Sequence, residues 1–395
     1  MAEIRLKKGK DKAVRQLHPW VFSGAVDNVK GSPDDGDIVT VTDHSGTFLA
    51  KGFFNSQSRV AVRLLEWTEN TDINELWWRN KIRKSLESRQ GLLDSKETNA
   101  YRLIFSEADF LPGLIADRYG DYISVQILTS GIEKVKGVLL DELQQQLRPK
   151  GIFDRSDASA RSHEGLDASF GSLYGEEPPE YVEVSENGIR YLINIAEGQK
   201  SGFFCDQRDN RRVVSEHASG KRMLDCFSYS GGFTLNCLKK GAAEVISVDS
   251  SPLAIETLKR NVSLNGFDGL KHQAIQSDVN KQLRLFKEQD ERFDVIVLDP
   301  PKYAPSRSLL DKASRAYKDL NRISMGLLNS GGLLATFSCS GAVDINHFKQ
   351  ILAWAALDAG KDVQFIHQFS QPEDHPVRAS FPEGEYLKGL LCRVI

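Results

Sequence analysis

Residues 224–234 read Leu-Asp-Cys-Phe-Ser-Tyr-Ser-Gly-Gly-Phe-Thr, an apolar strand that passes into a helix through two adjacent glycines. From about residue 220 onward the sequence keeps alternating between short β-branched runs and helical spacing. Strands are predicted at 221–227, 244–249, 272–277, 293–299, 333–338, 363–368 and 386–395, and helices at 232–240, 253–265, 279–288, 310–328 and 346–358. Repeated βα units predict an α/β fold with a doubly wound, mostly parallel seven-stranded sheet.

Acidic residues follow the second and third of these strands. In a doubly wound sheet, ligands bind at the carboxyl ends of the strands, near the switch in strand order. Asp249 is placed to accept both hydroxyls of a ribose, and Asp278 can accept an adenine amino group. A dinucleotide needs G-x-G-x-x-G for its pyrophosphate, whereas this chain has only Gly231-Gly232 behind the bulky Phe227. The pattern therefore favours S-adenosylmethionine, which has no phosphate, over a nicotinamide dinucleotide.

The fourth strand runs into Asp299-Pro300-Pro301-Lys302-Tyr303. Two consecutive prolines fix the backbone and remove two amide donors, which leaves the carbonyl groups of Asp299 and Pro300 able to face a planar substrate. A rigid turn at a strand end accounts for the prolines but not for the acid before them. Asp-Pro-Pro-aromatic sequences are similar to those of methyltransferases that act on bases or amides. Taken alone, this motif indicates methylation of an amino group.

The fifth strand ends at a cysteine, in Phe337-Ser338-Cys339-Ser340-Gly341. Small polar neighbours are expected to leave the sulfur of Cys339 accessible. Cytosine C5 is a poor nucleophile, but addition of a thiolate to C6 makes C5 enamine-like and able to attack a methyl group. Cys339 is therefore the predicted nucleophile of a cytosine-C5 methyltransferase. The other cysteines are weaker candidates near the cofactor (Cys205, Cys226) or expected core residues (Cys237, Cys392).

The first 180 residues have a different sequence pattern from the βα units that follow. Strands at 36–43, 47–54 and 60–66, broken by the turn at 43–46, predict a small barrel or sandwich. The segment 73–93 has helical spacing and is expected to act as a connector. Further elements are predicted as a hairpin over 114–128, a helix at 132–147, a strand at 151–155, a linker at 175–180 and a hairpin that turns at Asn187-Gly188.

Composition places the chain among globular proteins with more than one domain. Its 395 residues are 40% hydrophobic and 27% charged, with a formal net charge of −3, which excludes disorder and a wholly basic nucleic-acid binder. No apolar run approaches the roughly 20 residues that span a bilayer, and the basic start at 1–10 predicts no secretory signal. Five irregularly spaced cysteines predict a reducing, cytoplasmic location. No metal site is predicted, whereas basic sets within 1–20, 79–84 and 307–322 can neutralise phosphates.

Several stretches resemble the ribosomal RNA large subunit methyltransferase I family, bacterial enzymes that make 5-methylcytosine in 23S rRNA. The resemblance runs nearly end to end and is carried by residues 18–25, 201–209, 224–234, 294–303, 337–341 and 374–394. It implies a PUA domain, an RNA-binding small barrel, at 1–72. It also implies a middle α+β domain at 73–180 and a Rossmann-like class I methyltransferase domain at 181–395.

The resemblance also implies roles for single residues. By motif, Asp249 would hold the ribose, Asp278 the adenine, Asp299 would face the target base, and Cys339 falls on the position of the nucleophile. The implied cofactor contacts are Asp225, Phe227, Gly231, Asp249, Ser250, Asp278, Asp299 and Arg208, and the implied substrate contacts are Pro300, Pro301 and Lys302. Two positions depart from the family: Cys205 often has an aliphatic counterpart, and Ser230 a threonine. Neither change removes a role, but Cys205 adds a second thiol that labelling experiments must exclude.

Three other interpretations remain open from the sequence. The same fold and cofactor could methylate a purine nitrogen, and Cys339 would then be dispensable. An RNA-binding ribosome-assembly protein without turnover is disfavoured by the acids at the strand ends, and a nicotinamide oxidoreductase by the incomplete glycine pattern. The sequence leaves a homodimer open and does not identify the target nucleotide.

Overall fold

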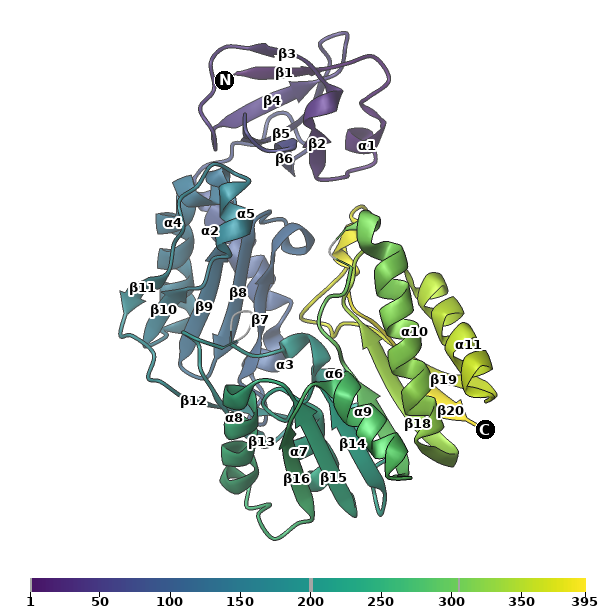
Figure 1. Cartoon of the computed structure of the whole chain (residues 1–395). Helices are drawn as coiled ribbons and strands as arrows, with labels where there is room; N and C mark the ends of the chain where they lie inside the picture. The colour runs from purple at the N-terminus through teal and green to yellow at the C-terminus, as the bar shows by residue number, and fades with distance from the viewer. Residues whose placement is uncertain (1, 199–201, 305) are drawn as a thin grey trace. The chain divides into compact units, whose positions relative to one another are not determined.

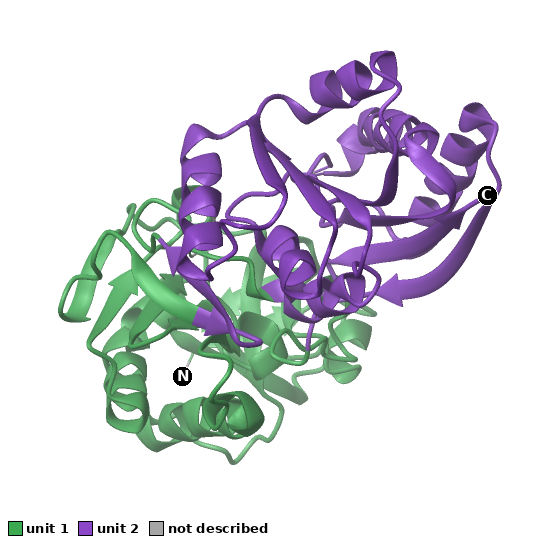
Figure 2. Cartoon of the chain, turned by 90° about the horizontal axis from the view of Figure 1, so that it is seen from below, with its two compact units in different colours: residues 1–184, 194–205, 373–384 green, residues 185–193, 206–372, 385–395 purple. Residues whose placement is uncertain are grey.

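The computed structural model describes residues 2–198, 202–304 and 306–395. Ser201, the first residue of the family-like stretch 201–209, lies outside these ranges. The chain forms two compact units, drawn in green and purple in Figure 2. Unit 1 comprises residues 1–184, 194–205 and 373–384, and unit 2 comprises 185–193, 206–372 and 385–395.

Unit 1 begins with a six-stranded sheet in the order β2-β6-β5-β4-β1-β3. Its strands are β1 (Glu3–Leu6), β2 (Trp20–Phe22), β3 (Val26–Lys30), β4 (Ile38–Thr42), β5 (Phe48–Phe54) and β6 (Val60–Glu66), with the short helix α1 (Lys12–Arg15) between β1 and β2. β1 pairs parallel to β4, and the other pairs are antiparallel. Alternate residues such as Ile4, Val41 and Val62 point into one apolar core.

A second sheet of unit 1 has the order β11-β10-β9-β8-β7. It is formed by β7 (Ala100–Phe105), β8 (Leu114–Tyr119), β9 (Tyr122–Ile127), β10 (Gly151–Asp154) and β11 (Gly171–Gly175), and it is accompanied by α2 (Glu75–Glu87), α3 (Gln90–Leu93), α4 (Ser130–Leu147) and α5 (Ala158–Ser162). Arg79 and Arg83 of α2 form ion pairs of 3.0 and 2.7 Å with the buried Glu142 of α4. Two members of the basic set at 79–84 therefore hold two helices together.

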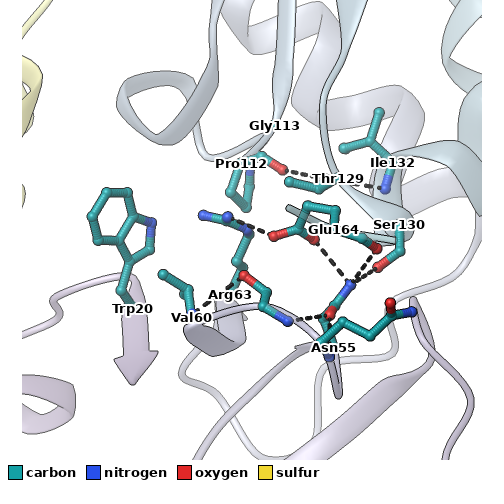
Figure 3. Close-up of polar contacts among 12 residues, drawn as sticks. Trp20, Asn55, Val60, Arg63, Pro112, Gly113, Thr129, Ser130, Ile132 and Glu164 are labelled. Carbon is teal, nitrogen blue, oxygen red and sulfur yellow. Dashed lines mark hydrogen bonds and ion pairs between the residues drawn. The ribbon is translucent and has the colours of Figure 1, made fainter. Parts of the chain in front are cut away.

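A buried polar network joins the six-stranded sheet to the start of α4 and to Glu164, which follows α5 (Figure 3). The side-chain amide of Asn55, just after β5, donates to Ser130 Oγ at 3.0 Å and to the carbonyl of Glu164 at 2.9 Å. Arg63 of β6 donates to the Glu164 carboxylate at 2.8 Å. Because buried polar groups are costly when they lose their partners, this network fixes the six-stranded sheet against the segment that begins α4.

Unit 2 is built on a seven-stranded sheet in the order β16-β15-β14-β17-β18-β20-β19. Its strands are β14 (Arg222–Cys226), β15 (Glu244–Asp249), β16 (His272–Gln276), β17 (Phe293–Leu298), β18 (Leu328–Ser338), β19 (Val363–Phe369) and β20 (Lys388–Val394). The pairs from β16 to β18 are parallel, and β20 runs antiparallel to both of its neighbours. The predicted mostly parallel, doubly wound sheet is confirmed, and the strand order reverses between β14 and β17.

Five helices alternate with these strands: α7 (Gly232–Lys239), α8 (Pro252–Leu264), α9 (Val279–Glu288), α10 (Leu310–Gly326) and α11 (Ile345–Ala359). Figure 1 shows α9, α10 and α11 together on one face of the sheet. Their buried residues Leu283, Tyr317 and Phe348 share one core with strand residues such as Ile296 and Leu334. The helix α6 (Arg208–Ser215) and the hairpin of β12 (Val182–Glu186) and β13 (Ile189–Ile193) precede the sheet. In the described ranges, no helix is long and apolar enough to cross a membrane.

Candidate active site

The loop from β14 to α7 has an unusual backbone. Phe227 and Tyr229 have φ angles of 61° and 45°, and Gly231 has a φ angle of 89°. The left-handed region is unfavourable for bulky residues, so a conformation that repeats it at two aromatic residues must be held by other contacts. Two backbone hydrogen bonds contribute, from Ser228 N to Val248 O at 3.1 Å and from Gly231 N to Ser228 O at 2.8 Å.

Close packing explains the two glycines of this loop. A Cβ atom on Gly231 would lie 3.0 Å from Leu258 Cγ, and a Cβ atom on Gly232 would collide with the guanidinium group of Arg211. Arg211 lies on α6 and pairs with the buried Glu186 at 2.9 Å. Arg208 is also buried and stands three residues earlier on α6, so both arginines share the helix face that lies against the loop.

Asp225, at the end of β14, is almost fully buried. Its Oδ2 atom accepts hydrogen bonds from Thr234 N at 3.0 Å and Thr234 Oγ1 at 2.7 Å. Among the described residues, its Oδ1 atom and the hydroxyls of Ser228 and Ser230 have no hydrogen-bond partner. Burial raises the pKa of Asp225 to about 7, and the nearby charge of Asp299 adds to the rise. Buried polar atoms that have no hydrogen-bond partner are expected where a polar ligand binds.

Asp249 closes the same edge of the sheet from β15. Its Oδ2 atom accepts from Tyr229 N and its Oδ1 atom from Ser251 N, both at 2.9 Å. These bonds aim the carboxylate along the β14–α7 loop, and each oxygen keeps a further lone pair that can accept a hydroxyl group. Ser250, the next residue, is exposed.

Asp278 follows β16 and caps the next helix. It is exposed, and its Oδ1 atom accepts from Lys281 N at 2.9 Å in the first turn of α9. Since Ser277 N also donates to Asp249 O at 2.9 Å, the ends of β15 and β16 are fastened together. The two acids expected to hold the ribose and the adenine thus follow neighbouring strands at one edge.

The Asp-Pro-Pro loop after β17 is fixed to the segment that follows β18. Asp299 is half-buried, Pro300 is buried, and Pro301 and Lys302 are exposed. Ala304 N donates to Ser340 Oγ at 3.0 Å, directly after Cys339.

Tyr317 of α10 completes this connection. Its hydroxyl lies 3.0 Å from Ser338 Oγ and 3.1 Å from Ser340 Oγ, so it contacts both neighbours of Cys339. Burial raises the pKa of Tyr317, and the charges of Cys339 and Asp299 act in the same direction. The two predicted catalytic residues are therefore both close enough to Tyr317 for their charges to affect it.

Cys339 differs from the other four cysteines in its exposure. It is half-exposed, whereas Cys205, Cys226, Cys237 and Cys392 are buried. Burial raises the pKa of Cys226 and Cys237 well above that of an ordinary thiol, and that of Cys392 to about 12. The expected burial of Cys237 and Cys392 is confirmed. Cys339 is thus the cysteine best placed to react with a ligand from solvent.

Several residues of this site were not predicted from the sequence. Thr234, Tyr317, Ser340 and Lys388 were not singled out, although each contacts a predicted site residue or its neighbour. For Lys388 a signal existed, because a lysine that opens a mostly apolar strand is unusual. The sequence gives no such signal for Tyr317, since an aromatic residue at helical spacing is predicted to be an ordinary core residue. Within the described ranges, no group of three or more metal-binding side chains was found.

Two family models match this chain. Residues 4–67 match the model of a PUA-like domain, and residues 161–392 match the model of an S-adenosylmethionine-dependent methyltransferase. The chain is 43% identical to ribosomal RNA large subunit methyltransferase I of Aliivibrio fischeri (strain MJ11), over 99% of both chains. It is 41% identical to the protein of that name from Escherichia coli (strain SMS-3-5 / SECEC), over 99% of this chain and 98% of the other.

Solved structures share the fold over the whole chain. A protein described as a methyltransferase and solved with SAH has a TM-score of 0.87 at 22% identity, and the match covers 100% of both chains. A Streptococcus mutans protein described as a SAM-dependent methyltransferase gives 0.85, also at 22% identity with both chains covered fully.

The titration of Asp225 leads to a prediction about stability. Its pKa is about 7 in the folded chain against an ordinary value of 3.8. The folded state therefore holds the proton more tightly than the unfolded state, and stability is lost as the pH rises from about 4 to about 7. Asp225→Asn removes this titration. The free energy of unfolding of the wild type minus that of Asp225→Asn should fall by about 1 kcal/mol per pH unit between about pH 5 and about pH 7, then level off.

Urea unfolding at a series of pH values measures this difference. Asp290→Asn, at an exposed loop residue, is the control and should show no such slope. A difference between the wild type and Asp225→Asn that stays level across the whole range would contradict the raised pKa.

Proposed function

The chain belongs to the ribosomal RNA large subunit methyltransferase I family of S-adenosylmethionine-dependent enzymes, and on this basis we propose that it forms 5-methylcytosine in 23S rRNA. The observation that carries the proposal is the placement of Cys339 beside the Asp299 loop. A half-exposed thiol and an Asp-Pro-Pro turn share the Tyr317–Ser340 contacts at the carboxyl edge of the sheet. A thiol in this position is what C5 chemistry needs and what methylation of a nitrogen does not.

The cofactor is assigned to the other end of this edge. S-adenosylmethionine supplies an electrophilic methyl group on a sulfonium sulfur. We assign the ribose hydroxyls to Asp249, whose carboxylate is aimed by two backbone N–H groups, and the adenine to Asp278. Asp225 and the hydroxyls of Ser228 and Ser230 are buried polar groups that a bound amino acid moiety would satisfy. We assign four more residues to the same site. Two lie in the β14–α7 loop (Phe227 and Gly231), one follows Asp249 (Ser250), and one lies on the face of α6 against the loop (Arg208).

Cys339 is the proposed nucleophile. Its thiolate adds to C6 of the target cytosine, and the electron pair of the C5–C6 double bond moves so that C5 attacks the methyl group. The bond from the methyl group to the sulfonium sulfur would break in the same step, and its electron pair would go to that sulfur. A base or water then removes the C5 proton, and the electrons of that C–H bond restore the double bond as the C6–S bond breaks. The thiolate is regenerated, so Cys339 is unchanged at the end of the cycle.

The Asp299-Pro300-Pro301 turn is the proposed binding site of the target base. Asp299 is half-buried and can accept a hydrogen bond from the cytosine amino group, and the rigid prolines hold the carbonyl groups of the turn in place. Lys302 is exposed on the same loop and is assigned to a phosphate of the RNA. In this arrangement Asp299 orients the base and Cys339 reacts with it.

The division of the chain into a PUA domain at 1–72, a middle domain at 73–180 and a methyltransferase domain at 181–395 is part of the proposal. It is supported by the six-stranded sheet, the five-stranded sheet and the seven-stranded sheet that occupy these ranges. The rRNA is assigned to the basic N-terminal region through phosphate contacts. A cytoplasmic location is proposed because the substrate is ribosomal.

A second candidate is methylation of a purine nitrogen. The feature that favours it is the Asp299-Pro300-Pro301 turn itself, which on its own suits an amino or ring nitrogen held by carbonyl oxygens. It gives no role to Cys339, although this is a half-exposed thiol at the same edge of the sheet. The two candidates therefore differ in whether Cys339 is needed.

Asp249→Ala is expected to weaken binding of S-adenosylmethionine by about 10- to 150-fold. The two ribose hydroxyls lose a charged acceptor, worth about 1.5–3 kcal/mol. Isothermal titration calorimetry gives the affinity, and thermal melting checks that the variant is folded. Glu288→Ala, at an exposed position of α9, is the matched loss of one acid and should bind as the wild type does. An unchanged affinity in a folded Asp249→Ala would remove Asp249 from the site.

Cys339→Ala is expected to abolish methylation and the covalent adduct with RNA. With 5-fluorocytosine in the RNA, C5 has no proton to lose, so the thioether to C6 persists and survives denaturing electrophoresis. Cys226→Ala and Cys205→Ala should retain the adduct, because both thiols are buried. Methylation of rRNA by Cys339→Ala at the wild-type rate would overturn the C5 mechanism and favour the purine-nitrogen candidate.

A further inference from the structure

A buried lysine lies beside the proposed nucleophile. Lys388 begins β20 and is only 5% exposed. It stands in register with Ser338 on the neighbouring strand β18, one residue before Cys339. The rest of β20 is mostly apolar, with Gly389, Leu390 and Leu391 next in sequence. A lysine in such a strand is costly unless its charge has a partner.

The ammonium group of Lys388 holds the backbone next to Cys339. Its Nζ atom donates to the carbonyl oxygen of Ser340 at 2.9 Å. The hydroxyl of the same serine accepts from Ala304 N and contacts Tyr317. Ser340 is therefore fixed through both its backbone and its side chain, and Cys339 lies between this residue and the buried end of β18.

Charged groups around Lys388 act on it in opposite directions. Burial lowers its pKa, and the positive charge of Lys302 acts the same way, whereas Cys339, Glu385 and Asp344 favour the charged form. Glu385 and Asp344 are exposed, so water and salt screen their effect. The Cys339 thiolate is only partly exposed, and electrostatic interaction between two groups is mutual. Lys388 therefore favours the thiolate as much as the thiolate favours the ammonium group.

We propose that Lys388 is a positioning residue for the nucleophile: it fixes the turn after β18 through the Ser340 carbonyl and stabilises the negative charge of Cys339. This role rests on the proposed function of Cys339 in the C5 reaction. The thiol proton leaves to solvent, which Cys339 contacts, and Lys388 keeps its three protons throughout. The proposal gives Lys388 no contact with the base or the methyl group, so its effect is expected to reach the reaction through Cys339 and the Ser340 turn.

The test measures the reactivity of Cys339 without any RNA. The full chain is treated with iodoacetamide over a range of pH, and mass spectrometry of the peptide that contains residue 339 gives the rate for this thiol alone. Lys388→Gln removes the charge but keeps a donor for the Ser340 carbonyl. We expect the pH at which the alkylation rate is half-maximal to rise by about one unit in Lys388→Gln.

Three further variants separate charge from structure. Lys388→Met removes both charge and donor and should raise the midpoint at least as far. Lys388→Arg keeps the charge and should stay near the wild type. Lys287→Met, at an exposed position of α9, makes the same change in net charge and should have no effect. Should one neutral variant fail to fold in thermal melting, the other still decides the outcome.

A wild-type midpoint in folded Lys388→Gln or Lys388→Met would overturn the proposal. A second readout is methylation: a neutral variant should lower kcat more than it changes KM for RNA, with part of the loss recovered at higher pH. The proposed function is tested separately, by Cys339→Ala. If the proposed function is wrong, Cys339→Ala still methylates rRNA, and this result does not depend on the alkylation midpoint of the Lys388 variants.

Discussion

The parallel pairing of β17 with β18 is the constraint on which the candidate active site depends. The register places Leu298 opposite Thr336, so both strands end at the same edge of the sheet. β17 leads directly into Asp299, and β18 continues for two more residues before Cys339. The hydrogen bond from Ala304 N to Ser340 Oγ then fastens the two loops to each other. Without this pairing, the turn that is proposed to hold the base and the thiol that is proposed to attack it would have no fixed relation.

The same edge concentrates backbone strain and buried polar groups. Phe227 and Tyr229 adopt left-handed conformations, and Asp225 is buried with a pKa raised to about 7. Such features lower stability and persist only where the surrounding structure holds them. Besides the bond from Gly231 N to Ser228 O within the loop, contacts come from Thr234 on α7 and from Asp249 on β15. Their concentration at one edge is consistent with a site selected for ligand binding rather than for stability.

The sequence predicted the architecture of residues 220–395 closely, because βα units have strong periodicity. The helix predicted at 279–288 is α9 without a change of bounds, and the strand predicted at 244–249 is β15. Strands β1, β2, β3 and β7 were not predicted, since they are short or carry little alternation. The residues around Cys339 were missed for a different reason: Lys388 reaches Ser340 only because β20 inserts antiparallel beside β18, and no local pattern carries that pairing.

The central claim is that the methyl group goes to carbon 5 of a cytosine in large-subunit rRNA. The most direct measurement incubates the wild-type protein with S-adenosylmethionine that carries a tritiated methyl group and with unmodified rRNA, digests the RNA to nucleosides and separates them by chromatography. We expect the radioactivity to elute with 5-methylcytidine. Radioactivity in a methylated purine, or none in RNA while the protein binds S-adenosylmethionine, would contradict it.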